Sequence, residues 1–79
     1  MERTLDRAYV ILKTLAESGD LSYTDLITLA TPRLGSVTTA ERTMNQCLKC
    51  GFIERPEKGV YRLAEKGRAM ITALETPTT

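Results

Sequence analysis

The 79-residue sequence contains no histidine and no tryptophan. Histidine is the most frequent general base in enzymes, so its absence excludes His-based catalytic triads and His-containing metal sites. The sequence also lacks a glycine-rich phosphate loop of the GxxxxGK[ST] type, and its carboxylates are scattered singly. We therefore expect a protein that is not an enzyme, holds no metal and needs no cofactor.

Long hydrophobic runs are also missing, since no apolar stretch approaches the roughly 18 residues that a membrane span requires. Charged residues interrupt the N-terminal segment MERTLDRAYVILKTL, which distinguishes it from a signal peptide. We expect a cytoplasmic protein without a membrane anchor. Its length predicts a single domain over residues 1–79 with a thin core, and the tail 76–79 is expected to be frayed.

Neither sign of charge dominates, with 11 Lys and Arg against 10 Asp and Glu. The distribution along the chain is nevertheless uneven. Residues 1–37 carry four basic and five acidic side chains, whereas residues 38–68 carry seven basic and four acidic ones. The middle of the chain therefore has a mild bias towards a polyanionic partner.

The spacing of apolar residues predicts two helices in the first half of the chain. In the segment 4–18 apolar side chains recur every three or four positions, and a glycine follows as a stop. Ser22 precedes a second helix, with Asp25 three positions later in a variant of the capping box. Pro32 and Gly35 are expected to end this helix, because the residue before a proline disfavours the helical conformation.

A third helix is predicted over about residues 39–50, from a capping box formed by Thr38 and Glu41 to a terminal glycine. Its apolar residues share one face of the helical wheel: Ala40, Met44, Cys47 and Leu48. The opposite face is a polar stripe: Arg42, Asn45, Gln46 and Lys49. Any surface helix has such a polar face, so the stripe alone does not establish a binding site.

The last third of the chain predicts a β-hairpin and a final helix. Residues 52–55 and 60–63 are typical of strands, and Pro56-Glu57-Lys58-Gly59 is typical of a turn. The final helix is expected over residues 64–74, interrupted near its start by Gly67. The predicted fold class is α+β and mostly helical, with a three-helix core, a two-stranded β wing and a C-terminal helix.

This order of elements is that of a winged helix-turn-helix, and two segments resemble small bacterial and archaeal regulators of the MarR and PadR type. The run GFIER at 51–55 resembles their G-hydrophobic-I-x-R segment, and YRLAEKG at 61–67 resembles Y-x-L-T-E-K-G. The resemblance covers about residues 5–74. The chain departs from the pattern in two ways: Ala64 replaces the usual threonine, and the extra helices with which MarR-type proteins dimerise are missing.

The resemblance implies a sequence-specific duplex-DNA-binding protein that regulates transcription, with the third helix in the major groove and a wing at about 52–63 on the backbone. Arginine can pair with guanine, and asparagine or glutamine with adenine, so the base-reading candidates are Arg42, Asn45 and Gln46. The candidates for contacts to the DNA backbone are Tyr23, Thr24, Thr38, Thr39, Lys49, Arg55, Lys58 and Arg62. One such small domain reads few base pairs, so we expect a homodimer formed through the first or last helix.

Other interpretations stay open beside this one. A winged helix with weak basic character can instead be a protein-protein interaction module that does not bind DNA. The basic residues of the wing alternate with Glu54 and Glu57, so they could form ion pairs across an ordinary hairpin. Glu41 would repel phosphate, and its place in the capping box explains it better. The sequence gives no sign of a small-molecule ligand.

Both cysteines lie in the segment CLKCG, as Cys47 and Cys50. Structural zinc normally takes four protein ligands, so a zinc site would require two chains to meet in a dimer. Cys47 is expected to face the core, where a reduced cysteine behaves as a small hydrophobe. A redox or metal-sensing role is the third interpretation, and the metal-sensing ArsR proteins carry cysteines in this helix with a different spacing.

Overall fold

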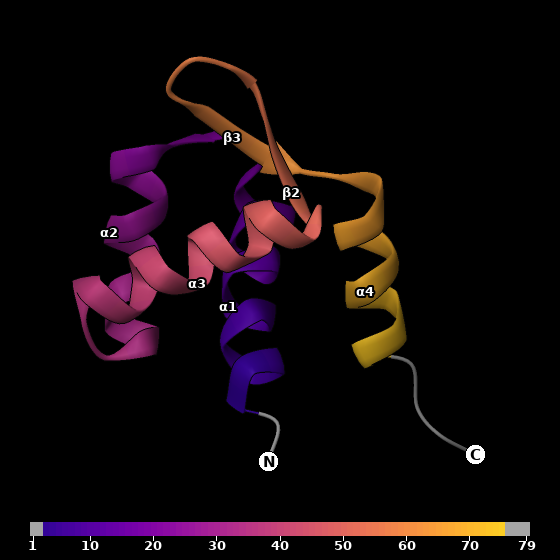
Figure 1. Cartoon of the computed structure of the whole chain (residues 1–79), viewed down its shortest axis with the longest axis horizontal. Helices are drawn as coiled ribbons and strands as arrows, with labels where there is room; N and C mark the ends of the chain where they lie inside the picture. Colours follow the sequence, from indigo (N-terminus) through magenta and orange to yellow (C-terminus); the bar gives the residue numbers. More distant parts are fainter. Residues whose placement is uncertain (1–2, 76–79) are drawn as a thin grey trace.

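The computed structural model describes residues 3–75, which form four helices and a three-stranded antiparallel sheet (Figure 1). The order is α1 (Arg3–Ser18), β1 (Leu21–Ser22), α2 (Tyr23–Leu34), α3 (Val37–Cys50), β2 (Ile53–Glu57), β3 (Val60–Leu63) and α4 (Glu65–Glu75). The helices and the sheet confirm the predicted α+β class. The tail 76–79, which was expected to be frayed, lies outside the described residues. None of the helices within residues 3–75 has the length and apolar character needed to cross a membrane.

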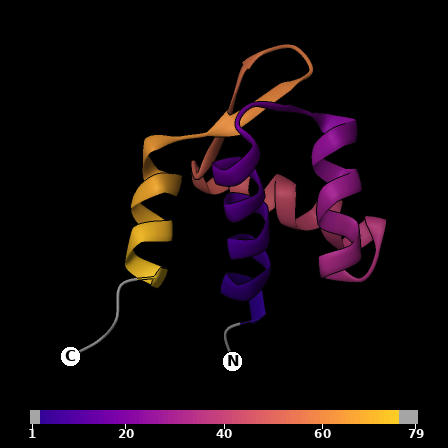
Figure 2. The same cartoon turned by 180° about the vertical axis from the view of Figure 1, so that it is seen from behind.

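The core lies around α1, which packs against the other three helices (Figure 2). Ile11 and Leu12 of α1 are fully buried, as is Leu26 of α2. α4 is also held to α1 by polar contacts, since the Glu75 carboxylate accepts hydrogen bonds from the Tyr9 hydroxyl at 2.6 Å and the Lys13 ammonium at 2.8 Å. Burying so many apolar side chains against one helix makes α1 the centre of the fold.

A strand that the sequence did not predict completes the sheet. β1 pairs with β3, with Leu21 opposite Tyr61 and Ser22 opposite Val60, so the strand order is β1-β3-β2. β1 has two residues, too few to show the alternating pattern from which strands are recognised. The two-stranded wing expected from the sequence is therefore part of a three-stranded sheet that ties the start of α2 to the hairpin.

The prediction that Pro32 ends the second helix is wrong. α2 continues to Leu34 and ends at Gly35, which has a φ of 97° and donates its N–H to the Thr31 carbonyl at 2.8 Å. A proline inside a helix removes one backbone hydrogen bond. The helix extends only two residues beyond this proline, and Leu34 packs against the core there. Core packing thus outweighs the local preference.

The predicted start of the third helix is also wrong. Ser36, not Thr38, is the N-cap, so α3 begins at Val37. The Ser36 hydroxyl oxygen accepts the Thr39 N–H at 3.1 Å, which satisfies one of the free donors at the helix start. Glu41 consequently lies too far along the helix to complete a capping box with this serine, and the capping role expected for it is not observed.

The hairpin has a shorter turn than predicted. β2 extends to Glu57, so the tip consists of the two residues 58–59. Between the paired positions Glu54 and Glu57, β2 contributes two residues, Arg55 and Pro56, where β3 contributes one. This is a β-bulge, and a bulge is one of the few positions in a sheet that tolerate proline.

Gly67 does not interrupt the last helix, contrary to the prediction. It is buried inside the continuous helix α4, against the backbone that leads into β2. A Cβ atom built at this position would lie 2.1 Å from the carbonyl oxygen of Phe52 and 2.9 Å from a side-chain carbon of Leu63. The glycine therefore allows α4 to pack directly on the hairpin.

Cys47 faces the core, as expected for a packing residue. It is 1% exposed. This burial is the main cause, and the neighbouring Cys50 the second cause, of a rise in the pKa of its thiol to about 12. Cys50 is half-buried, and both cysteines are reduced. The structure supports the interpretation of Cys47 as a small apolar residue.

Gly67→Ala is expected to lower the free energy of unfolding by roughly 1–3 kcal/mol, because the new methyl group overlaps the Phe52 carbonyl and α4 must move. Helix propensity alone predicts the opposite sign. Urea unfolding followed by circular dichroism measures the difference. Ala69→Gly, at an exposed position of the same helix, is the control for propensity. A higher unfolding midpoint for Gly67→Ala would contradict the close packing.

Cys47 is expected to react with a thiol reagent only when the protein unfolds, whereas Cys50 reacts in the native state. Stability is also expected to fall as the pH rises from 9 to 12. In the unfolded chain the thiol ionises near its ordinary pKa of 9.0, whereas in the folded protein its pKa is about 12. Between these two pH values the unfolded chain releases a proton that the folded protein keeps, so the folded state loses stability. Cys47→Ala lacks this component of the pH dependence. Equal native reactivity of both thiols would show that Cys47 is not buried.

Candidate nucleic-acid interface

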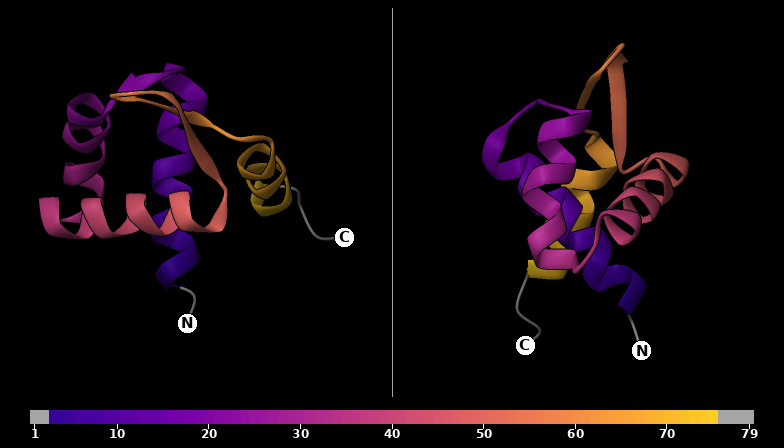
Figure 3. Two further views of the ribbon diagram at one scale, coloured as in Figure 1. Left: turned by 45° about the horizontal axis from the view of Figure 1, so that its top comes forward. Right: turned by 90° about the vertical axis from the view of Figure 1, so that its left-hand side faces the viewer.

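Four exposed polar side chains form a row on α3, at spacings that keep them on one side of the helix: Arg42, Asn45, Gln46 and Lys49. The other side of α3 is buried, with Ala40, Met44 and Cys47 at most 1% exposed. The amphipathic pattern predicted for this helix is confirmed. In the right-hand view of Figure 3, α3 lies at one side of the molecule and the hairpin rises beside it.

No member of this row forms a hydrogen bond or an ion pair with another described residue. A guanidinium group offers a planar fork of donors, and the two amides each offer a donor and an acceptor. The row is therefore a set of free hydrogen-bonding groups that can read complementary groups on a partner.

The buried face of α3 includes Thr43, which the sequence analysis did not assign to it. Thr43 is 8% exposed, and its hydroxyl donates to the Thr39 carbonyl at 2.8 Å. This internal bond satisfies the hydroxyl, so a polar side chain can lie against α1. The apolar pattern alone could not identify a threonine paired in this way.

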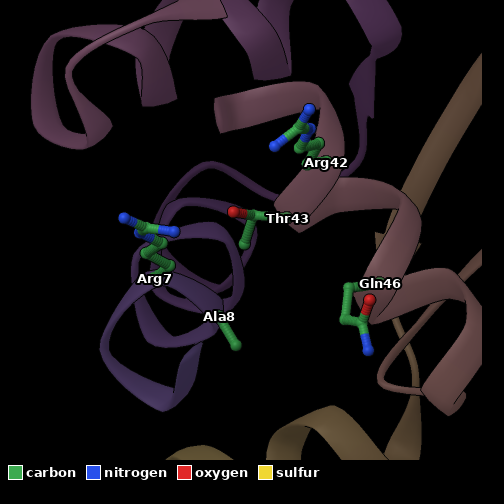
Figure 4. Close-up of a pocket in the computed structure, with 5 residues that line it drawn as sticks. All are labelled: Arg7, Ala8, Arg42, Thr43 and Gln46. Carbon is green, nitrogen blue, oxygen red and sulfur yellow. The ribbon is translucent and has the colours of Figure 1, made fainter. Parts of the chain in front are cut away.

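A hollow of about 210 Å³ separates part of α3 from α1 (Figure 4). Arg42, Thr43 and Gln46 line it from α3, and Arg7 and Ala8 line it from α1. Arg7 was not among the candidates, because nothing in the sequence links it to a helix that begins 30 residues later. The hollow extends the polar surface of α3 onto the first helix.

Tyr23 and Glu41 connect the starts of α2 and α3. The Tyr23 hydroxyl donates to the Glu41 carboxylate at 2.5 Å. This hydrogen bond is the main cause, and desolvation the second cause, of a rise in the pKa of Tyr23 to about 12. The centre of the Tyr23 ring also lies 6.1 Å from the centre of the Tyr61 ring. A phosphate contact by the Tyr23 hydroxyl proton would require the bond to Glu41 to open.

The threonines at the helix starts differ in their surroundings. Thr24 and Thr38 are exposed, each at the second residue of its helix. Thr39 is half-buried, and its hydroxyl oxygen accepts a hydrogen bond from the Ser36 hydroxyl at 3.0 Å. Of these three threonines, only Thr24 and Thr38 have a hydroxyl that forms no hydrogen bond with a described residue, so these two are available to a binding partner.

The three basic residues of the hairpin also differ. Arg62 forms an ion pair with Glu54 across the strands, with a distance of 2.6 Å between Nε and Oε2. The guanidinium carbon of Arg55 lies 5.8 Å from the centre of the Tyr61 ring. Lys58 is exposed in the turn at the tip. The ion-pair interpretation of the hairpin thus describes Arg62, while the other two have no carboxylate partner among residues 3–75.

The described residues contain no group of three or more cysteine or carboxylate side chains that could hold a metal ion. Their exposed groups in this region include hydrogen-bond donors, amides and cations on α3 and the hairpin, together with the carboxylate of Glu57 beside Lys58. The donors, amides and cations suit the recognition of an anionic, hydrogen-bonding partner.

Comparisons with known proteins add no relative. No family model matches the chain, and no curated protein and no solved structure matches it either. The exposed groups of α3 and the hairpin, and the order of the elements that carry them, are therefore the basis for proposing a function.

Proposed function

We propose that this chain is a winged helix-turn-helix protein that binds duplex DNA sequence-specifically and regulates transcription. The observation that carries the proposal is the row of free polar side chains on α3: Arg42, Asn45, Gln46 and Lys49. A helix with an exposed row of this composition, followed by a hairpin with cations at and near its tip, is suited to a groove and its flanking phosphates.

α3 is the recognition helix in this proposal. Its 14 residues give a length of about 21 Å, and the major groove is wide enough to admit an α-helix. Arg42 is assigned to guanine, through two hydrogen bonds to O6 and N7. Asn45 and Gln46 are assigned to adenine, through N6 and N7. These contacts would supply sequence preference.

The assignments to the DNA backbone follow from which side chains are free. Lys49, Arg55 and Lys58 supply charge, while Thr24 and Thr38 supply hydroxyls at helix starts. Three of the candidates have internal hydrogen-bond partners, namely Tyr23, Thr39 and Arg62. We assign these three to positioning the helices and the hairpin.

We also propose that two copies of the chain form a homodimer through the outer faces of α1 or α4. A single domain of this size reads few base pairs, and two half-sites raise both affinity and specificity. Leu74 of α4 is 41% exposed and offers apolar surface for such a contact. A palindrome among duplexes selected from a random pool would report this symmetry.

Arg42→Ala and Gln46→Ala are each expected to relax the base preference at one position of the preferred duplex, with a loss of about 1–3 kcal/mol of binding free energy. The measurement is fluorescence anisotropy competition between that duplex and its single-base variants. Arg68→Ala on α4 removes the same charge as Arg42→Ala from an exposed position outside the row. If a row variant loses equal affinity for preferred and random duplexes, α3 does not read bases.

Lys58→Ala is expected to weaken binding equally for all sequences, because the lysine at the tip contacts phosphate and not bases. The slope of log affinity against log salt should become shallower by about one unit. Anisotropy titrations at several salt concentrations measure both effects, again with Arg68→Ala as the control. A loss confined to one sequence would assign Lys58 to a base.

The protein-interaction alternative is decided by the wild-type chain in the same titrations. Binding that does not weaken with added salt, or no binding to any duplex at micromolar protein, would reject the DNA proposal. The ion pair between Arg62 and Glu54 is the observation that favours this alternative, because it removes one cation from the hairpin.

A further inference from the structure

The hollow between α1 and α3 brings two arginines from different helices to one place. Arg7 and Arg42 both line it, and neither forms an ion pair or a hydrogen bond with a described residue. Glu41, the acidic neighbour of Arg42 in the sequence, accepts a hydrogen bond from Tyr23 of α2. Among the described residues, no carboxylate is therefore paired with the positive charge at the hollow.

The groups around the hollow favour an anion with several acceptor oxygens. Figure 4 shows Arg7 and Arg42 extending from their helices on the side of the Thr43 hydroxyl, with the Gln46 amide farther along α3. Two guanidinium forks and one amide are donors, whereas the Thr43 proton is already donated to the Thr39 carbonyl. A phosphate group matches this set, because it has several acceptor oxygens and a negative charge, about −1.5 to −2 for a monoester at neutral pH and about −1 for a diester of the DNA backbone.

The size of the hollow is sufficient for such a group. Its volume of about 210 Å³ greatly exceeds the roughly 15 Å³ that a single water molecule needs on the same measure. Ala8 and Thr43 also line it, and Figure 4 shows Thr43 between the two arginines. A hollow of this size can hold a phosphate group.

We propose that this hollow is a phosphate-binding site in which Arg7 and Arg42 clamp the oxyanion and Gln46 donates a third hydrogen bond. The phosphate belongs either to the DNA backbone, in which case Arg42 and Gln46 contact that phosphate and not a base, or to a free small molecule. In the second case the occupied site holds Arg42 away from its base and lowers DNA affinity. The effect on DNA rests on the function proposed above, whereas phosphate binding itself does not.

The first experiment uses inorganic phosphate and no DNA. Phosphate replaces chloride at constant ionic strength while two-dimensional NMR follows the backbone amides and arginine side chains. We expect saturable shifts centred on Arg7, Arg42 and Gln46. Arg7→Gln and Arg42→Gln should each weaken binding by about tenfold, as the loss of a charged hydrogen bond implies. Arg68→Gln, which removes the same charge from α4, should leave it unchanged.

The proposal is overturned if the shifts do not saturate, or if Arg68→Gln weakens binding as much as Arg7→Gln. Spectra of the variants without phosphate establish that each is folded. Arg7→Lys keeps the charge but loses the planar fork, so it should bind phosphate more weakly than the wild type and more tightly than Arg7→Gln.

The second experiment identifies the source of the phosphate. DNA affinity is measured in chloride and in phosphate at equal ionic strength, for the wild type and for Arg7→Gln. A DNA phosphate in the site predicts that Arg7→Gln weakens binding already in chloride. A free phosphate predicts unchanged affinity in chloride and the loss of inhibition by phosphate. No effect of Arg7→Gln in either buffer overturns the link to DNA.

The two proposals fail separately. A chain that binds phosphate saturably but no duplex would reject the DNA-binding function and keep the phosphate site. A chain that binds duplex DNA without saturable phosphate binding would reject the site alone.

Discussion

The rotation of α3 about its own axis determines which of its side chains are exposed and so available for binding. Ala40, Met44 and Cys47 are buried against the other helices, and this packing allows only one orientation of α3. Residues at the opposite positions of the wheel must then point outward, which is why the polar row is continuous. A rotation of a single residue position, about 100°, would bury polar side chains without partners. The core therefore positions the polar row, although none of the core residues belongs to it.

The hairpin is placed relative to α3 by short-range contacts at the end of that helix. The Phe52 N–H donates to the Cys47 carbonyl at 2.9 Å, and the Lys66 ammonium of α4 donates to the Cys50 carbonyl at 2.8 Å. These bonds satisfy carbonyls that a helix end leaves free. The same lysine lies 5.2 Å from the centre of the Phe52 ring. α4 thus contributes to the proposed interface indirectly, by holding the junction between α3 and the hairpin in one geometry.

The sequence was sufficient for features that repeat along the chain and insufficient for those that depend on one distant contact. The period of the apolar residues located all four helices, and the polar row of α3 followed from the same wheel. The error at the start of α3 arose because Ser36 and Thr38 are both good caps, and local rules do not choose between them. β1 exists only because β3 lies beside it. The Tyr23–Glu41 bond and the approach of Arg7 to Arg42 join residues of separate helices, and no local pattern encodes either.

The nearly neutral chain has a consequence for how such an interface would gain affinity. With 11 basic and 10 acidic residues, the protein as a whole provides little long-range attraction for a polyanion. The attraction must come from local separation of charge, that is, from cations on one surface that have no carboxylate partner. Glu54 is neutralised by Arg62, Glu75 by Lys13, and Glu41 is turned towards Tyr23. These contacts occupy three carboxylates, and Arg7, Arg42, Lys49 and Lys58 have no carboxylate partner among the described residues. The affinity of the proposed interface therefore depends on where these cations lie and not on the net charge of the chain.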